Sequence, residues 1–391
     1  MSAAAGTAEE VSRRPDDTDF KQQRLKAWQP ILTPRWVIGT FLVVGIIFVP
    51  VGVVLKNLSD EVVEFKCQYD GEGAGNSSSC TIEPSCKIST EQLEALGDTA
   101  PDPCYITIDV DEKMEADVFV YYELHNFYQN HRRYVKSRED AQLRGEVFTS
   151  ESDLQDCLPL VEKGDTVLSP CGLIANSLFN DVITLTNSDV EMREDDISWQ
   201  SDRDAKFDQP DDFISERLRN TSASDKAQAC IEQLESDVPD SQVSSIGFTV
   251  FEGEDWCFFY RNEDQITYLY EIYPEVINPV EGVNNEHFIV WMRTAGLPQF
   301  RKLYGRIEED IPKGTQLRFQ IVPRFIVEEF DGKKFIVVST TTWFGGRNPF
   351  LGIAYIVVGS ICLFLSLVFF VKHTVAPRKL GDTRYLVWKD Q

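Results

Sequence analysis

Two long apolar runs stand out from an otherwise mixed pattern of hydrophobic and polar positions. They are Trp36–Leu55 and Phe350–Val371, and neither contains a charged residue. At about 1.5 Å of rise per residue, each is long enough to cross about 30 Å of hydrocarbon as a helix, and each is apolar on all sides. No small-residue cleavage site follows the first run, so we expect an uncleaved signal anchor. The pattern predicts a membrane hairpin with two helical spans.

Basic residues beside the runs predict its orientation. Residues 21–35 carry four Lys or Arg and no acid, and residues 372–391 carry five Lys or Arg against two Asp. Basic flanks favour the cytoplasmic side of a membrane. We therefore expect both termini to be cytoplasmic. The predicted order is a cytoplasmic tail at 1–35, a span at 36–55, a luminal or extracellular domain at 56–349, a span at 350–371 and a cytoplasmic tail at 372–391.

The domain between the spans has mainly the pattern of β-strands. β-branched and aromatic residues predict strands at Cys104–Val110 and Ala116–Leu124, the second with both faces buried. Asp331-Gly332 favours a type I′ hairpin turn between strands Phe325–Phe330 and Lys333–Thr340. Further strands are predicted at Gly247–Phe251, Gln265–Tyr273, Phe288–Thr294 and Thr315–Val322, and a helix at Asp225–Ser236. The expected fold is a disulfide-bonded, antiparallel β-sandwich-like ectodomain with helical and loop insertions.

Charge is concentrated in this ectodomain. It contains 27 Lys and Arg against 56 Asp and Glu, a net charge of −29. Such a surface argues against nucleic acid or anionic headgroups as its general ligand, and a well-solvated surface is a simpler interpretation than a cation-binding one. Residues 208–285 are the most acidic stretch and contain their own cysteine pair. We interpret them as a self-contained insertion.

Cysteines support an oxidising environment for the ectodomain. Eight of the nine lie there, Cys362 lies in the second run, and neither tail has any. An even number on the oxidising side predicts four disulfides. Proximity favours Cys157–Cys171 and Cys230–Cys257. The first four, Cys67, Cys80, Cys86 and Cys104, can pair in three ways, and this pattern leaves the choice open.

Three sequons occur, at Asn57, Asn76 and Asn220. Asn57 is two residues past the first run, too close to the bilayer for the transferase. Asn76 and Asn220 lie in polar stretches and are the expected glycosylation sites.

Signatures of catalysis are missing. The sequence has no P-loop, GxSxG, HExxH or GxGxxG signature, and its acidic pairs lie in solvated stretches. Absence of a CxxC pair and the scarcity of His argue against zinc. The spans contain no ionisable side chain that would mark an ion path. We expect a protein that is not an enzyme and that uses no cofactor or metal.

Seven stretches together resemble one family. The resemblance is to the accessory β-subunits of type-IV P-type ATPases, the lipid flippases (the Lem-three/Cdc-fifty family). The stretches, in family order, are Phe20–Thr33, Phe127–Ser137 (FYQNHRRYVKS), Pro170–Asp181 (PCGLIANSLFND), Ile197–Phe207 (ISW..DR..KF), Glu286–Gly305 (EHFIVWMRTAGLPQFRKLYG), Gly345–Gly359 and Gly381–Leu386.

The resemblance implies a non-catalytic subunit that binds the catalytic flippase chain as a heterodimer. It would assist that chain's folding, its exit from the endoplasmic reticulum and its transport cycle, which moves phospholipid to the cytoplasmic leaflet. The implied location is the endoplasmic reticulum, the Golgi and endosomes, or the plasma membrane. An asymmetric β-sandwich is the implied fold. Cys157–Cys171 would be a family disulfide, and a nested Cys67–Cys104 with Cys80–Cys86 fits the first group.

Two features depart from the family. The sequon of many members near Asn180 is lost, because Val182 replaces the hydroxyl residue. Residues 208–285 also exceed the expected length, so no family contact is transferred to them.

Partner contacts are expected in three layers. In the tail, the basic and aromatic residues before the first run would lie against the partner's cytoplasmic side; they are Phe20, Arg24, Lys26 and Trp28. In the spans, a seam of small residues would pack on partner helices. It comprises Gly352, Gly359 and Ser366, with Gly45 and Gly52. In the ectodomain, the stretches Phe127–Ser137 and Trp291–Tyr304 would cap the partner's short luminal loops, through seven candidate residues. They are Asn130, His131, Arg132, Arg133, Tyr134, Trp291 and Arg293.

Two alternatives share the hairpin topology. A two-span ligand-gated ion channel subunit would need a polar pore face, and the second run offers only Tyr355, Ser360, Cys362 and Ser366. A stand-alone receptor ectodomain would not need matching motifs in both tails. We also expect contact with membrane lipids, and we expect no binding of nucleic acid.

Overall fold

The computed structural model describes residues 16–25, 33–77, 79–97, 99–187 and 189–377. They form two compact units, one containing the long terminal helices and one comprising residues 58–348. The predicted tail residues Lys26 and Trp28, and the stretch Gly381–Leu386, lie outside the described residues.

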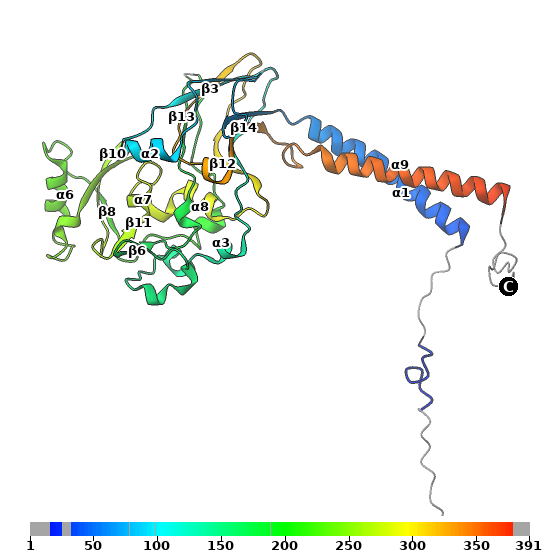
Figure 1. Cartoon of the computed structure of the whole chain (residues 1–391), viewed down its shortest axis with the longest axis horizontal. Coiled ribbons are helices and arrows are strands. Elements are labelled where there is room, and N and C mark those ends of the chain that lie inside the picture. Colours follow the sequence, from blue (N-terminus) through cyan, green and yellow to red (C-terminus); the bar gives the residue numbers. More distant parts are fainter. Residues whose placement is uncertain (1–15, 26–32, 78, 98, 188, 378–391) are drawn as a thin grey trace, which may run out of the picture. The chain divides into compact units, whose positions relative to one another are not determined.

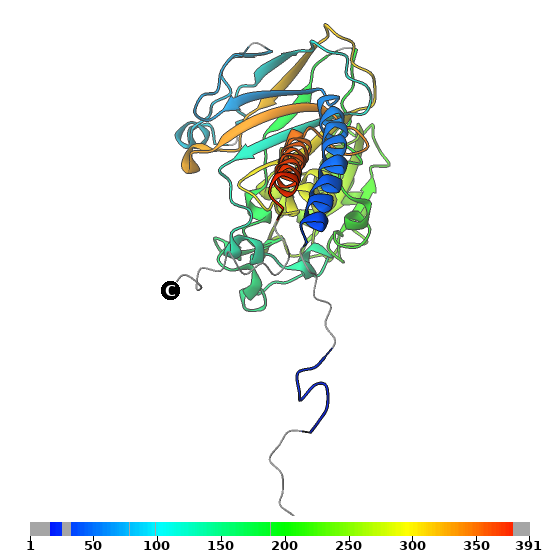
Figure 2. The same cartoon turned by 90° about the vertical axis from the view of Figure 1, so that its right-hand side faces the viewer.

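The terminal helices pack as an antiparallel pair (Figures 1 and 2). They are α1 (Pro34–Asp60) and α9 (Pro349–Val375), and both have the length and composition of membrane spans. Small residues set their separation, because a Cβ built on Gly45 would lie 2.9 Å from the Gly359 carbonyl oxygen. Nearer the start of α1, the Ser366 hydroxyl donates to the Ile38 carbonyl at 3.1 Å.

Two four-stranded antiparallel sheets form the centre of the described ectodomain. One has the order β1 (Glu64–Asp70), β14 (Lys333–Thr340), β4 (Val118–His125) and β12 (Gln299–Ile307). The other has the order β2 (Cys80–Glu83), β3 (Cys104–Asp109), β13 (Gln316–Val322) and β7 (Val182–Leu185). Their inner faces contribute to one hydrophobic cluster that includes Ile106, Val120, Phe319 and Ile336. The predicted sandwich is confirmed.

Smaller elements surround this sandwich. One three-stranded sheet contains β8 (Ile214–Arg217), β10 (Glu254–Phe259) and β9 (Gly247–Phe251), and another contains β11 (Ile266–Tyr268), β6 (Thr166–Ser169) and β5 (Glu162–Lys163). The described helices of this unit are α2 (Thr90–Leu96), α3 (Arg132–Lys136), α4 (Asp140–Leu143), α5 (Gln200–Arg203), α6 (Lys226–Leu234), α7 (Leu269–Ile272) and α8 (Glu286–Met292). Single 3-10 turns occur at Glu151–Asp153, Gln155–Cys157, Ala175–Ser177, Val243–Ser245, Gly282–Asn284 and Glu328–Phe330.

Several predicted strands are wrong or shorter. Phe288–Thr294 is largely helix α8, whose first turn is capped by the Asn285 side chain, which accepts from the Phe288 amide at 3.2 Å. In Gln265–Tyr273 only β11 is a strand, and α7 follows it. Strand β4 buries one face fully and the other only partly, so the prediction of two buried faces is only partly right.

The predicted hairpin at Asp331-Gly332 is also wrong. Strand β14 pairs with β1 and β4, not with residues 325–330. The backbone amides of Arg324 and Phe325 instead donate to the Asp181 carboxylate, both at 2.6 Å. Asp331 does adopt the left-handed conformation (φ 51°), but it follows a 3-10 turn.

The four predicted disulfides are present, and the nested pairing of the first group is wrong. Cys67 pairs with Cys80, and Cys86 pairs with Cys104. The reason lies in the β2–β3 register, in which Glu83 faces Tyr105. This register brings Cys86, just past the end of β2, beside Cys104 at the start of β3, while Cys80 faces Ile108 and is available to Cys67. Cys157–Cys171 and Cys230–Cys257 pair as expected.

Candidate functional site

Three of the quoted sequence stretches meet around α8. Asn130, from Phe127–Ser137, donates to the Gly296 carbonyl at 2.9 Å, and the Ala295 amide donates to Gln129 at 2.8 Å. Asp202, from Ile197–Phe207, pairs with Arg293. Residues more than 150 positions apart therefore share one surface, which we call the motif surface: residues 127–137, 193–207 and 286–306.

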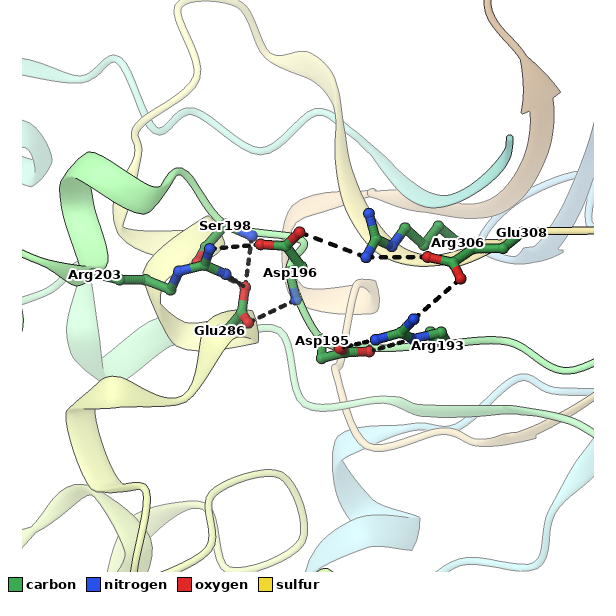
Figure 3. Close-up of polar contacts among 8 residues, drawn as sticks. All are labelled: Arg193, Asp195, Asp196, Ser198, Arg203, Glu286, Arg306 and Glu308. Atoms are coloured by element: carbon green, nitrogen blue, oxygen red, sulfur yellow. Dashed lines mark hydrogen bonds and ion pairs between the residues drawn. The ribbon is translucent and has the colours of Figure 1, made fainter. Parts of the chain in front are cut away.

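Glu286 connects the 193–203 loop to the first turn of α8 (Figure 3). Its carboxylate accepts from the Asp196 amide at 2.7 Å, the Ser198 amide at 2.8 Å and the Ser198 hydroxyl at 2.7 Å. Arg203 adds a charged donor at 2.9 Å. Partial burial raises the pKa of the Glu286 carboxyl, but these donors outweigh burial and hold the pKa below its usual range. The connection therefore persists at mildly acidic pH.

The ion pairs continue along the same loop (Figure 3). Arg193 pairs with Asp195 and reaches Glu308 at 3.0 Å, and Arg306 lies 3.2 Å from Glu308. The backbones of Arg193 and Arg306 also exchange hydrogen bonds at 2.8 and 2.9 Å. Each exposed pair contributes on the order of 1 kcal/mol or less. Their combined effect is to hold the loop in a single register against the end of β12.

A cavity of about 530 Å³ opens beside Arg293. Four cations line it: Arg138, Arg144, Lys206 and Arg293. The acids there are Asp140 and Asp202, and Asp202 is buried and pairs with both Lys206 and Arg293. The hydrogen bond from Arg293 holds the pKa of Asp202 below its usual value. The cavity is thus net positive on a strongly acidic domain, which favours an anionic group of a partner.

Lys302 closes the other end of α8. Its ammonium donates to the Val290 carbonyl at 2.8 Å, to the Trp291 carbonyl at 3.2 Å and to the Arg293 carbonyl. These are acceptors that the end of a helix leaves unsatisfied. Burial lowers the pKa of Lys302 to about 7, and the Arg293 guanidinium acts in the same direction.

The predicted ectodomain residues fall into two groups. His131, Arg132 and Arg133 are exposed on α3, and in the described part of the chain neither arginine has a hydrogen-bond or ion-pair partner. Tyr134 is half-buried, its hydroxyl lies 2.8 Å from Ser177, and burial raises its pKa to about 12.

Trp291 is fully buried, and its indole donates to the Ile174 carbonyl at 2.8 Å. Because no surface of it is accessible, Trp291 supports the motif surface from beneath. Arg293 is half-exposed and lies over the ring of Trp199. Four large apolar side chains are also exposed on this surface: Tyr128, Val135, Trp199 and Leu297.

The small-residue seam does not face outward. A Cβ on Gly352 would lie 2.7 Å from the Lys56 amide nitrogen, and one on Gly359 would lie 2.9 Å from Val49. Together with Ser366, these residues pack α9 on α1 of the same chain. The assignment of this seam to partner helices is therefore corrected. The regular spacing of small residues along one span does not show whether they face a partner helix or the other span of the same chain.

Two other predicted groups are exposed. In the tail, Phe20 is exposed and Arg24 pairs with Asp17. The sequon residues Asn76 and Asn220 are both exposed, and the Asn76 side-chain oxygen accepts from the Ile82 amide at 2.7 Å.

Sequence analysis did not single out Glu286, Asp202, Arg203 or Lys302. All four lie inside the quoted stretches, so their position in these motifs could have marked them as candidate functional residues. Asp196, Arg193 and Arg306 lie outside or at the edges of the motifs and could be found only from the contacts.

Comparison with known proteins identifies the family. The model of the LEM3 (ligand-effect modulator 3) family / CDC50 family matches residues 55–379. The chain belongs to this family. The predicted family of non-catalytic flippase β-subunits is thereby confirmed.

Curated members of the family are similar along nearly the whole chain. "ALA-interacting subunit 3" of Arabidopsis thaliana is 37% identical, over 99% of this chain and 94% of its own length. "Cell cycle control protein 50A" of Bos taurus is 36% identical, over 94% and 90%. "Cell cycle control protein 50B" of Homo sapiens is 34% identical, over 93% and 95%. The similarity therefore includes the spans as well as the ectodomain.

Proposed function

We propose that this chain is the accessory subunit of a phospholipid flippase and forms a heterodimer with the catalytic type-IV P-type ATPase chain. Family membership supports this proposal, and one relative carries the words "ALA-interacting subunit" in its name. The catalytic chain hydrolyses ATP and moves phospholipid to the cytoplasmic leaflet. This subunit assists its folding, its exit from the endoplasmic reticulum and its transport cycle.

The proposed topology follows the basic flanks. Both termini are cytoplasmic, residues 56–349 are luminal or extracellular, and Asn76 and Asn220 carry glycans. The exposure of both asparagines is compatible with modification.

One observation carries the proposed contact: the motif stretches converge on a single surface with two unpaired arginines. Arg132 and Arg133 lie beside exposed Tyr128, and the adjoining loop exposes Leu297. Arginine and aromatic side chains are enriched in protein interfaces. The positive charge of α3 and of the Arg293 cavity selects acidic groups on the partner's luminal loops.

Co-purification of the full-length chain with a co-expressed type-IV P-type ATPase tests this contact. The variant Arg132→Glu/Arg133→Glu reverses two exposed charges that have no hydrogen-bond or ion-pair partner in the described part of the chain, so it should fold. We expect recovery of the ATPase to fall at least about tenfold, as for loss of an interface hot spot.

The matched control is Lys87→Glu/Lys313→Glu, which makes the same charge change at two exposed positions away from the motif surface. It should leave recovery unchanged. If the ATPase is recovered equally well with both double variants, the motif surface is not part of the interface. Recovery of a homo-oligomeric ring without an ATPase would overturn the accessory-subunit assignment itself.

A further inference from the structure

A pocket of about 340 Å³ lies at the end of the ectodomain where the chain joins the spans. Leu58 and Ser59, which line one side, come within four residues of the first apolar run. Arg347 and Asn348 line another side and come directly before the second span. Covalent connection to both runs places this pocket at the level of the lipid headgroups on the ectodomain side.

The charge of this pocket is opposite to that of the domain around it. Arg301 and Arg347 line it, and among the described residues no carboxylate does. Arg301 is held in place by Glu64 at 2.8 Å and lies over the ring of Tyr121. Arg347 is exposed, and within the described residues it has no ion-pair partner. One guanidinium is therefore fixed and neutralised, and the other is available to an anion.

The pocket wall is an ordered structure. The backbones of Thr342 and Gly345 exchange hydrogen bonds at 2.8 and 3.1 Å, and the Thr342 hydroxyl donates to the Gly345 carbonyl at 3.1 Å. Gly345 has φ +118°, which disfavours any side chain there. The Asn348 amide donates to the Ser59 hydroxyl at 2.9 Å, which joins the two segments that enter the spans.

Aromatic side chains surround this turn. Trp343 is 83% exposed and Phe344 is 49% exposed, and neither belongs to the ectodomain core. Exposed Trp and Phe next to a span are typical of the headgroup region, where their rings lie among lipid glycerol and acyl groups. The turn therefore carries one ring suited to lipid, that of Trp343, while Phe344 and Arg347 line the pocket.

We propose that this pocket binds the phosphodiester of one glycerophospholipid in the leaflet beside the ectodomain. A planar guanidinium donates two parallel hydrogen bonds to a phosphate, and the volume is within the range of small-ligand sites. Arg347 is the charged ligand, Arg301, already paired with Glu64, forms the wall beside it, and the 342–348 turn encloses the group. The proposal does not rest on the catalytic partner. It requires only that α1 and α9 span the membrane.

The test uses the full-length chain in nanodiscs of phosphatidylcholine that contain a small fraction of a phospholipid with a photoreactive headgroup. After irradiation, labelled peptides are mapped by mass spectrometry. We expect label on peptides containing residues 56–64 and 341–349. In Arg347→Gln the labelling should fall on the order of tenfold, as for loss of a charge-assisted pair of hydrogen bonds.

Arg347→Lys tests whether the lipid is recognised by a specific pocket or only attracted by a positive charge near the membrane surface. Lysine keeps the charge but loses the paired donors, so labelling should fall almost as far as in Arg347→Gln. Lys313→Gln, an exposed cation elsewhere on the domain, should label as the unaltered chain does. Full labelling of Arg347→Lys, or label spread evenly over the ectodomain, would overturn the proposal.

A competition arm distinguishes the source of the phosphate. Excess soluble glycerophosphocholine and inorganic phosphate should leave labelling largely intact, because the acyl chains hold the lipid at the pocket. Complete competition by either soluble compound would show a site for free phosphate compounds and would contradict the lipid assignment.

Discussion

At the scale of single residues, a buried charge cluster connects segments that are far apart in the sequence. The Lys334 ammonium is fully buried and lies 2.7 Å from Asp181 and 3.1 Å from Asp70. The Tyr69 hydroxyl donates to Asp181 at 2.9 Å, and the Asp181 carboxylate also accepts the amides of residues 324 and 325. Asp181 is the last residue of the PCGLIANSLFND stretch, so the role of this motif residue is structural.

Asp181→Asn should destabilise the ectodomain strongly. Removing one partner of a buried ion pair leaves an uncompensated charge and costs about 3–5 kcal/mol. We expect a large fall in the midpoint of thermal unfolding of the detergent-solubilised chain, followed by intrinsic fluorescence. Asp165→Asn, at an exposed loop position, is the control and should leave the midpoint unchanged. A small effect of Asp181→Asn would show that Asp70 alone compensates Lys334.

Lys302 should make stability depend on pH above neutrality. Its folded-state pKa of about 7 is below the ordinary lysine value, so between pH 7 and about 10 the unfolded chain binds more protons. The free energy of unfolding should therefore rise with pH in this window. Below it Lys302 is protonated in both states, so it should add no pH dependence. Lys302→Met removes the titrating group. The comparison is the change in unfolding midpoint between pH 7 and 9, and equal slopes for both proteins would contradict the assignment.

At the scale of elements, α8 is a helix made of residue types that favour a β-strand. Glu286–Met292 is rich in β-branched and aromatic residues, which favours a strand, yet capping by Asn285 and by Lys302 makes it a helix. Its apolar side chains are buried on most sides, so neither a period of two nor a period of 3.6 is visible. Tertiary contacts at both ends therefore decide its conformation.

Gly359→Leu should disrupt the pairing of α1 and α9. A Cβ there already lies 3.0 Å from the Phe48 Cβ, so a larger side chain forces the helices apart, at a cost of about 1–3 kcal/mol. Gly39→Leu is the matched control, because no atom of the described residues lies within 4 Å of a Cβ at that position. The readout is the yield and thermal stability of the monodisperse chain without any partner. If both variants behave alike, the seam does not hold the hairpin.

At the scale of the whole molecule, the acidic stretch 208–285 is only partly self-contained. Cys230–Cys257 lies in a small separate core formed by α6 and the β8–β10–β9 sheet. Beyond Tyr260, however, β11 pairs with β6, and Tyr273 and Ile277 enter the main core. The first part of this stretch therefore has its own core, and Tyr273 and Ile277 share the core of the sandwich.

Removal of residues 1–30 should separate assembly from activity. The ectodomain and spans remain, so the complex with the ATPase should be recovered. The basic and aromatic tail is lost, and loss of about 1 kcal/mol of contacts to the catalytic chain lowers turnover about fivefold. The measurement is ATPase turnover of the purified complex at equal protein concentration. Unchanged turnover would mean that the tail serves only as a topology signal.

The sequence by itself determined the two spans, the disulfide count and the family, because these depend on uninterrupted apolar length, on the number of cysteines outside the tails and on contiguous motifs. It also predicted β4, β9 and β13 closely, where β-branched and aromatic residues are dense. Only the tertiary structure decided how the first four cysteines pair, which helix the glycine seam faces and that Trp291 is buried. Each of these depends on which distant segments become neighbours, and no local pattern contains that information.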